Sequence, residues 1–115
     1  MLARANRLTS AEDYRVLVRR GARSGGAHIV SYYRITGTGV PARFGFIVSK
    51  KVGNAVCRNS VRRRLKAASR GLVDAGFSGV DVVFRALPSA ADAGWDALER
   101  DVQKTGQRTV RTEEH

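Results

Sequence analysis

The chain has 115 residues, of which 43% are hydrophobic and 7% aromatic, so its composition suits one domain with a buried core and excludes a disordered chain. Lysine and arginine number 21 against 10 aspartates and glutamates, a formal net charge of +11. A single cysteine, Cys57, excludes an internal disulfide and a multi-cysteine zinc site. No apolar run has the length of a membrane helix, and residues 1–7 lack the apolar segment of a secretory signal. We therefore expect one cytoplasmic domain over residues 1–115.

The basic residues are concentrated in one part of the chain. No acidic residue lies between Asp13 and Asp74, whereas 14 lysines and arginines do. A folded chain tolerates such self-repulsion when a polyanion is its normal partner, and arginine pairs bidentately with phosphate. The distribution therefore predicts nucleic-acid binding. An anionic membrane surface is the main alternative, but no long amphipathic helix with large apolar side chains supports it.

The first predicted element is a helix that starts near Thr9 or Ser10 and ends at Gly21. Two strands follow, over His28–Ile35 and Arg43–Ser49, because both segments are rich in β-branched and aromatic residues. A glycine-containing turn separates them, so we expect the two strands to pair as a hairpin. The apolar residues of the helix recur at helical spacing and form one face: Tyr14, Leu17 and Val18.

A second helix is predicted from about Asn59 to Arg70, with Gly71 as its end. Its apolar residues fall on one side of a 3.6-residue helix and should pack on the core: Val61, Leu65, Ala68 and Leu72. The polar residues that cluster on the opposite side are Asn59, Arg62, Arg63, Lys66 and Arg70. The pattern indicates a helix that presents a dense cationic face to solvent or to a ligand.

A third strand is predicted over Asp81–Ala86, followed by a last helix that Ser89 or Asp92 would cap. Acidic residues are frequent in this last helix, so we expect it to face away from a nucleic acid. The order of elements, α-β-β-(β)-α-β-α, indicates an α+β fold, a small two-layer α/β sandwich. Residues 1–7 and 106–115 lack a regular pattern, and we expect them to be flexible.

Residues that could support catalysis by the protein itself are few. The chain has two histidines, His28 and His115, and its sequence contains no Ser-His-Asp array, metal-ligand cluster or phosphate-binding loop motif. Two-metal phosphodiester hydrolysis needs carboxylates that hold Mg²⁺, and the basic segment has none. We therefore expect no catalytic residue and no metal site in the protein.

The segment Ser49–Arg70 joins a basic loop that turns at Gly53 to the donor-rich helix, an arrangement that suits the phosphates and sugar edges of a structured RNA. Its pattern, Ser-Lys-Lys-Val-Gly-Asn-Ala-Val-x-Arg-Asn-x-x-Arg-Arg, resembles the RNR motif of the bacterial ribonuclease P protein family. The upstream residues that are similar to the first helix of that family are Arg7, Leu8, Asp13, Tyr14, Val16 and Gly21.

The resemblance implies a protein subunit of a ribonucleoprotein that removes the 5′ leader from precursor tRNA. The catalyst would be a large partner RNA that itself holds most of the bound Mg²⁺, with no organic cofactor, no membrane partner and one protein for each RNA. The resemblance also implies a left-handed β-α-β crossover around the basic helix, whereas the general rule predicts a right-handed one.

Carried over position by position, the resemblance implies two sets of RNA-binding residues. The set that faces the catalytic RNA is Lys51, Asn54, Arg58, Asn59, Arg62, Arg63 and Lys66. The set that lines a cleft for the leader, between the first helix and the sheet, is Arg7, Tyr14, Val18, Tyr32 and Lys50. Core packing is the alternative role for the two tyrosines. Two positions depart from the family: Ser60 replaces an arginine whose phosphate contact Arg64 could provide, and Val18 replaces an aromatic residue that would stack on bases.

Two other function classes fit the basic helix. One is a stand-alone RNA-binding or ribosome-associated module without a role in cleavage. The other is a DNA-binding domain that places the helix in a major groove, although an arginine-dense face with one asparagine suits phosphates better than base edges. A preference for one large structured RNA and a single-stranded leader would separate the ribonucleoprotein subunit from a generic binder.

Overall fold

The computed structural model describes residues 2–37 and 39–114, with side chains described as far as residue 109. The expected α+β class and order of elements are confirmed, with one further strand and two short 3-10 helices. In chain order the elements are η1 (Arg4–Asn6), α1 (Ala11–Arg20), β1 (Ala22–Gly25), β2 (Ile29–Ile35), β3 (Arg43–Ile47), α2 (Ala55–Asp74), β4 (Val80–Ala86), η2 (Pro88–Ala91) and α3 (Trp95–Glu114).

The strands form a four-stranded mixed sheet in the order β1-β2-β4-β3. β1 and β4 both run antiparallel to β2, and β3 runs parallel to β4. The predicted hairpin of His28–Ile35 with Arg43–Ser49, which correspond to β2 and β3, is therefore wrong, because β4 lies between these two strands. The actual hairpin is β1–β2. Its first strand reads Ala-Arg-Ser-Gly, which has no β-branched or aromatic residue to indicate a strand.

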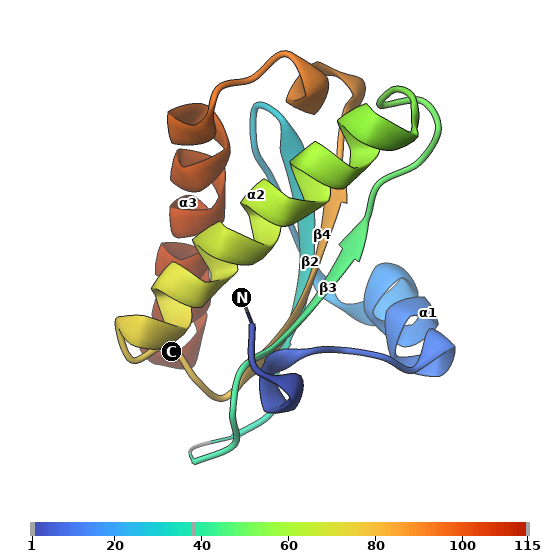
Figure 1. Cartoon of the computed structure of the whole chain (residues 1–115). Coiled ribbons are helices and arrows are strands. Elements are labelled where there is room, and N and C mark those ends of the chain that lie inside the picture. The colour runs from blue at the N-terminus through green and yellow to red at the C-terminus, as the bar shows by residue number, and fades with distance from the viewer. Residues whose placement is uncertain (1, 38, 115) are drawn as a thin grey trace.

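The helix α2 connects the parallel strands β3 and β4. In Figure 1 it lies in front of the sheet, both strands run upward, and β4 lies to the left of β3. This geometry is a left-handed crossover, as the family resemblance implies and against the general rule.

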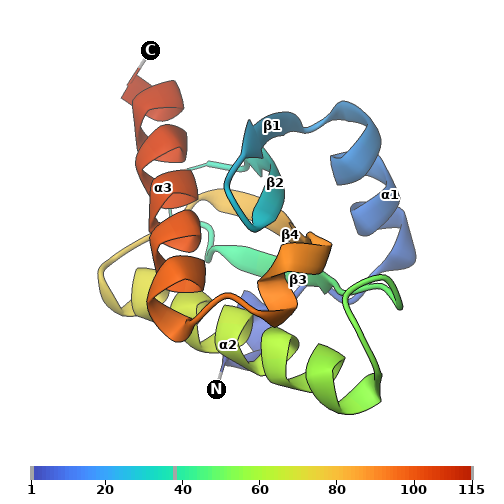
Figure 2. The same ribbon diagram turned by 90° about the horizontal axis from the view of Figure 1, so that it is seen from above.

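Helices cover both faces of the sheet, as Figure 2 shows from above. The main core lies between the sheet and the pair α2 and α3, where Phe44 and Phe84 stack with ring centroids 6.1 Å apart. A smaller cluster lies on the opposite face under α1, around the fully buried Leu17. Along each strand, side chains on one face of the sheet therefore pack against α2 and α3, and side chains on the other face pack against α1.

The helix boundaries differ from the predicted ones where capping decides them. α1 is capped by the Ser10 side chain, which accepts a hydrogen bond from the Asp13 amide. α2 begins at Ala55 rather than at Asn59, because the Asn54 side chain accepts a hydrogen bond from the Cys57 amide at 2.9 Å. It continues through Gly71, and its end is set by Gly76, whose φ of +95° favours glycine.

The described residues near both ends of the chain carry regular structure. Leu2 and Leu8 are buried, and the Asn6 side chain donates a hydrogen bond to the Ala42 carbonyl at 2.7 Å. α3 starts at Trp95, after the 3-10 turn at Pro88, and extends to Glu114. The expected mobility of residues 1–7 and 106–115 concerns dynamics and stays a prediction. Within the described residues, no helix has both the length and the apolar character to cross a membrane.

A buried carboxylate ties α1 to three strands. Asp81 of β4 is fully buried and accepts hydrogen bonds from Arg43 of β3 at 2.8 and 2.9 Å and from Arg34 of β2 at 3.0 Å. The Arg34 guanidinium also lies 3.2 Å from Asp13 of α1. Burial by itself raises the pKa of Asp81, but the hydrogen bonds from Arg43 and Arg34 outweigh it and lower this pKa below its ordinary value.

This cluster predicts acid-dependent stability. A carboxyl whose pKa is lowered by folding stabilises the fold above its ordinary pKa, and this stabilisation is lost as pH falls through the folded value. Asp81→Asn should lower the free energy of unfolding at pH 7 by about 3 kcal/mol, because it leaves two arginines without their buried partner. Urea denaturation followed by circular dichroism would measure this, with Glu12→Gln on the exposed surface as the control. The variant should also lose less stability than the wild type between pH 5 and pH 3, and an equal acid loss in both would contradict the assignment.

Candidate nucleic-acid interface

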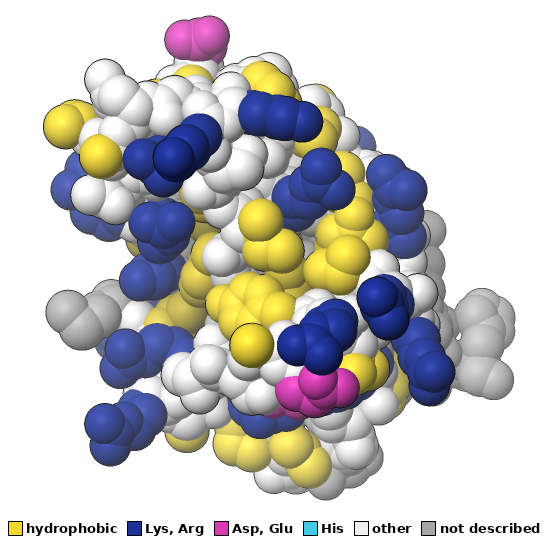
Figure 3. All heavy atoms as spheres, turned by 90° about the vertical axis from the view of Figure 1, so that its right-hand side faces the viewer, with side chains coloured by type: hydrophobic (Ala, Val, Ile, Leu, Met, Phe, Trp, Pro, Cys, Tyr) yellow, Lys and Arg dark blue, Asp and Glu magenta, His cyan; other side chains and the backbone are white. Residues whose placement is uncertain are grey.

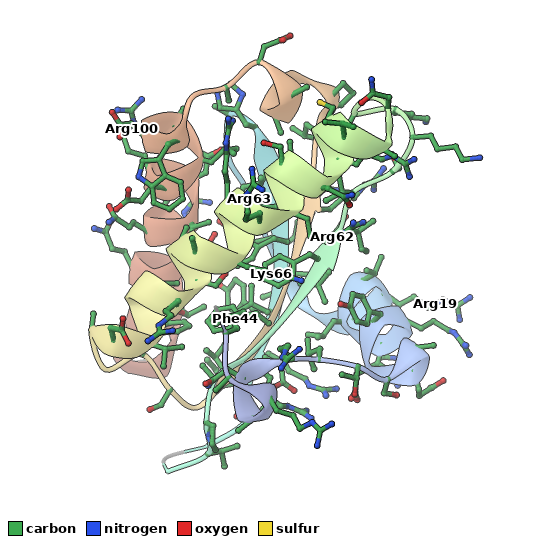
Figure 4. The ribbon with its side chains drawn as sticks, viewed as in Figure 1. Arg19, Phe44, Arg62, Arg63, Lys66 and Arg100 are labelled. Atoms are coloured by element: carbon green, nitrogen blue, oxygen red, sulfur yellow. The ribbon has the colours of Figure 1, made fainter. Side chains whose placement is uncertain are left out.

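Helix α2 is amphipathic in the way its sequence predicts. Val61, Leu65 and Ala68 are buried against the sheet, while Leu72 is half-buried. Figure 4 shows Arg62 and Lys66 on the flank of α2 nearer β3, and Arg63 on the side away from the sheet. The buried seam therefore fixes the rotation of the helix, and that rotation presents the cations outward.

The cations of α2 differ in whether they already have partners. Arg58, Arg62, Arg63 and Lys66 form no ion pair with any carboxylate in residues 2–37 and 39–109. Arg62 donates a hydrogen bond to the side-chain Oδ1 of Asn59 at 3.2 Å, which aligns two predicted RNA-binding side chains. We call the set Arg58, Asn59, Arg62, Arg63 and Lys66 the α2 cationic face. Its positive charge is uncompensated by neighbouring acids, so it attracts a polyanion.

Two other arginines of α2 have partners within the chain. Arg64 donates a hydrogen bond to the Ala93 carbonyl at 3.2 Å and so ties α2 to the segment before α3. This bond disfavours the expectation that Arg64 binds a phosphate in place of the arginine that Ser60 replaces. Arg70 lies 3.7 Å from Asp74 in the last turn.

Arg58 contains a buried donor without an acceptor. Its Nε is inaccessible to solvent and has no hydrogen-bond partner among the described residues. Buried donors are nearly always satisfied in folded proteins, so this atom favours an acceptor from a bound partner or an ordered water. The Arg58 side chain is half-buried within the α2 cationic face, and an RNA oxygen could reach its Nε only after the side chain moves, because this atom has no accessible surface.

The loop before α2 places Lys50 and Lys51 in solvent. The amides of Val52 and Gly53 bond to the carbonyls of Ser49 and Lys50, which makes a tight turn anchored by the buried Val52. Asn54, a predicted RNA-binding residue, uses its side-chain carbonyl to cap α2. Its amide nitrogen stays available to donate to a further partner.

The predicted leader cleft lies on the other face of the sheet, beside α1. The Tyr14 ring lies directly over Gly45 of β3, because a Cβ on Gly45 would lie 2.6 Å from the Tyr14 Cζ. The Tyr14 hydroxyl accepts a hydrogen bond from the Phe46 amide at 3.1 Å. Tyr32 is 6% exposed and belongs to the small core cluster, whereas Val18 is 38% exposed and Arg7 is also exposed. Core packing, the alternative role of the two tyrosines, therefore accounts for most of the Tyr32 side chain and for the one face of the Tyr14 ring that lies on Gly45.

Helix α1 covers only part of this sheet face. The strand register places Tyr32, Val83 and Gly45 side by side in one row under α1. The next row, towards the carboxyl end of β3, contains Val30, Arg85 and Ile47, and here Arg85 is exposed. Figure 3 shows this side of the molecule, with hydrophobic side chains in a hollow centre and lysines and arginines around it.

Arg85 was missed by the sequence analysis. The residues Asp81, Val83 and Arg85 alternate along β4 and so share the sheet face on which the leader cleft is predicted. This alternation was available in the sequence, but the apolar residues between them made the segment resemble an ordinary buried strand. The two predicted sets of RNA-binding residues thus lie on α2 and its loop and on the α1 face of the sheet, with Lys50 after β3 between them.

The described residues provide no evident catalytic group. No three His, Cys, Asp or Glu side chains within residues 2–37 and 39–109 are grouped to hold a metal ion. His28 Nδ1 lies 2.9 Å from Ser89 Oγ, but the nearby Asp101 carboxylate accepts from the His28 backbone amide rather than from its ring. The three side chains therefore do not form a Ser-His-Asp relay.

Comparison with known proteins gives one consistent family. The family described as Ribonuclease P matches residues 2–110. A ribonuclease P protein component of Clavibacter michiganensis is 49% identical over 97% of this chain and 99% of its own length. One from Pseudarthrobacter chlorophenolicus is 44% identical over 96% of this chain and 81% of its own. The solved RNase P protein of Staphylococcus aureus shares the fold, with a TM-score of 0.75 and 22% identity over 88% of this chain and 92% of that one.

The contact between Tyr14 and Gly45 predicts a non-additive pair of substitutions. Gly45→Ala should destabilise the wild type by about 2 kcal/mol, because the new methyl displaces the Tyr14 ring and its bond to Phe46. In a Tyr14→Ala background the same change should cost less than about 0.5 kcal/mol, since the space is then empty. Chemical denaturation of the four proteins measures the coupling. Equal costs in both backgrounds would show that Tyr14 does not lie on Gly45.

Proposed function

The chain belongs to the ribonuclease P protein family, whose members are the protein subunit of the endoribonuclease that processes the 5′ leader of precursor tRNA. On that premise we propose that two regions of the protein bind different RNAs. The α2 cationic face, with Lys51 and Asn54, holds the catalytic RNA. The cleft beside α1 holds the leader. The observation that carries this proposal is the row of cations on α2 without carboxylate partners among the described residues.

The α2 cationic face suits the backbone of a folded RNA. Arg58, Arg62 and Lys66 recur at four-residue spacing along one flank, so they can engage successive sites along a strand. Guanidinium groups bind phosphate oxygens bidentately, and Asn59 can reach a sugar hydroxyl.

The cleft suits an unpaired strand. Tyr14 has one ring face on Gly45, so a base can approach only its remaining surface, and the exposed Val18 offers an apolar contact rather than a stacking one. Tyr32 forms the floor. Arg7 and Lys50 are exposed and can pair with the phosphates. Recognition of this kind depends on charge and shape and tolerates many leader sequences.

We assign the chemistry and most of its Mg²⁺ to the catalytic RNA. The carboxylates nearest the cleft, Asp13 and Asp81, are engaged by Arg34 and Arg43 and cannot also hold a metal ion without releasing them. The protein then contributes binding and positioning within a complex of one protein and one RNA, in the cytoplasm where precursor tRNA is present. Family membership decides against the stand-alone module and the DNA-binding domain as alternatives.

Removing two cations of α2 should weaken assembly without unfolding the protein. Arg62→Ala combined with Arg63→Ala should reduce affinity for a bacterial ribonuclease P RNA about 100- to 10,000-fold, because charge-assisted hydrogen bonds contribute about 1.5–3 kcal/mol each. The salt dependence of binding should fall by about 1.5 in the log–log slope. Filter binding across a salt series measures both quantities.

The matched control is Arg100→Ala combined with Lys104→Ala, two exposed cations on α3. Figure 4 shows Arg100 on α3, well apart from Arg62. The control removes the same net charge, so it separates a local contact from a general loss of positive charge. Equal weakening by both double variants would contradict the assignment of the α2 cationic face.

A further inference from the structure

Arg85 occupies an unusual place for an arginine. It lies in β4, which has a neighbouring strand on each side, and the register places it between Val30 of β2 and Ile47 of β3. These neighbours are apolar, and Val30 is 7% exposed. The side chain therefore projects from an apolar row in the middle of the sheet rather than from an edge.

Two arginines on this sheet face, Arg34 and Arg43, are neutralised. Arg85 is not, nor is the exposed Arg23 of the edge strand β1, which the register places beside Tyr32. Arg34 and Arg43 lie two rows away, where they pair with Asp81 and Asp13. Arg85 is exposed, and its side chain makes no hydrogen bond or ion pair with any described residue. The same strand thus carries one buried ion-pair cluster and, four residues later, one uncompensated cation.

The local environment strengthens attraction to an anion. A guanidinium that stands on apolar side chains is screened less than one in open solvent, so a phosphate beside it is bound more strongly. The apolar row also excludes a neighbouring carboxylate that would compete. A purely structural role is the alternative, in which the methylene stem of Arg85 covers Val30 and Ile47 and the charge has no partner.

We propose that Arg85 is a binding residue for a backbone phosphate of the single-stranded 5′ leader, at the end of the cleft that α1 leaves open. This proposal rests on the proposed leader cleft and adds a specific anchor to it. Tyr14 and Tyr32 lie one row away, about 7 Å along the strands. A strand that contacts the tyrosines can therefore continue over Arg85 towards Lys50.

The test uses holoenzyme assembled from a bacterial ribonuclease P RNA with wild-type protein or with Arg85→Met, which keeps the apolar stem and removes the charge. Arg100→Met on α3 is the matched control. Dissociation constants are measured for precursor tRNA with a leader and for leaderless tRNA, over a salt series. Melting curves and affinity for the catalytic RNA alone are measured for each protein.

We expect Arg85→Met to weaken binding of the leader-bearing substrate about fivefold to twentyfold, with no change for leaderless tRNA. The salt slope for the leader-bearing substrate should fall by about 0.7, as for one phosphate on a single strand. A scan of neutral methylphosphonates through the leader should find one position that weakens wild-type binding and has no further effect in Arg85→Met. Arg85→Lys should recover part of the affinity that Arg85→Met removes.

The possible outcomes distinguish a failure of the Arg85 assignment from a failure of the proposed leader cleft. If wild-type holoenzyme binds leader-bearing and leaderless substrates equally, the leader cleft itself is wrong. If the wild type discriminates and Arg85→Met discriminates just as well, the cleft stands and the role of Arg85 is overturned. Weaker binding of the catalytic RNA by Arg85→Met would also overturn it, since Arg85 would then belong to the assembly surface.

Discussion

The buried carboxylate of Asp81 organises the part of the molecule on which both proposed RNA-binding regions depend. It lies in β4, draws Arg34 and Arg43 from the two neighbouring strands, and through them reaches Asp13 of α1. A fully buried charge is tolerated because its hydrogen bonds are satisfied by two guanidinium groups. The position of α1 over the sheet, and so the width of the cleft, follows from this cluster. So does the placement of β3, which leads into the basic loop and α2.

Whether a lysine or arginine is free to bind an anionic partner depends on which carboxylates the fold places near it. The acid-free stretch of the sequence suggests a uniform positive surface, yet Asp13 and Asp81 come from outside that stretch and neutralise two of its arginines. Similarly, Asp101 is buried and binds the His28 amide, so it adds little to an acidic surface on α3. The α2 cationic face and Arg85 therefore have no carboxylate partner among the described residues, and their positive charge is available to bind an anion.

Local sequence signals predicted the local structure well and the long-range pairing poorly. The seam of Val61 and Leu65 predicted the rotation of α2, because helical periodicity depends only on neighbouring turns. The strand partners did not follow, since β3 reaches β4 only after the whole of α2 and nothing local records that pairing. Arg85 was missed because the apolar residues around it resemble an ordinary buried strand, and only the strand pairing shows that Val30 and Ile47 flank it. The left-handed crossover came from family resemblance alone, as no spacing in the chain encodes its hand.

The central claim is that this protein supplies binding surfaces to an enzyme whose catalyst is RNA. Multiple-turnover cleavage of a leader-bearing precursor tRNA at low Mg²⁺, by a bacterial ribonuclease P RNA with and without the protein, tests it most directly. The account predicts strong stimulation by the protein together with the RNA and no cleavage by the protein alone. Cleavage by the protein alone, or no stimulation of a cognate RNA, would contradict it.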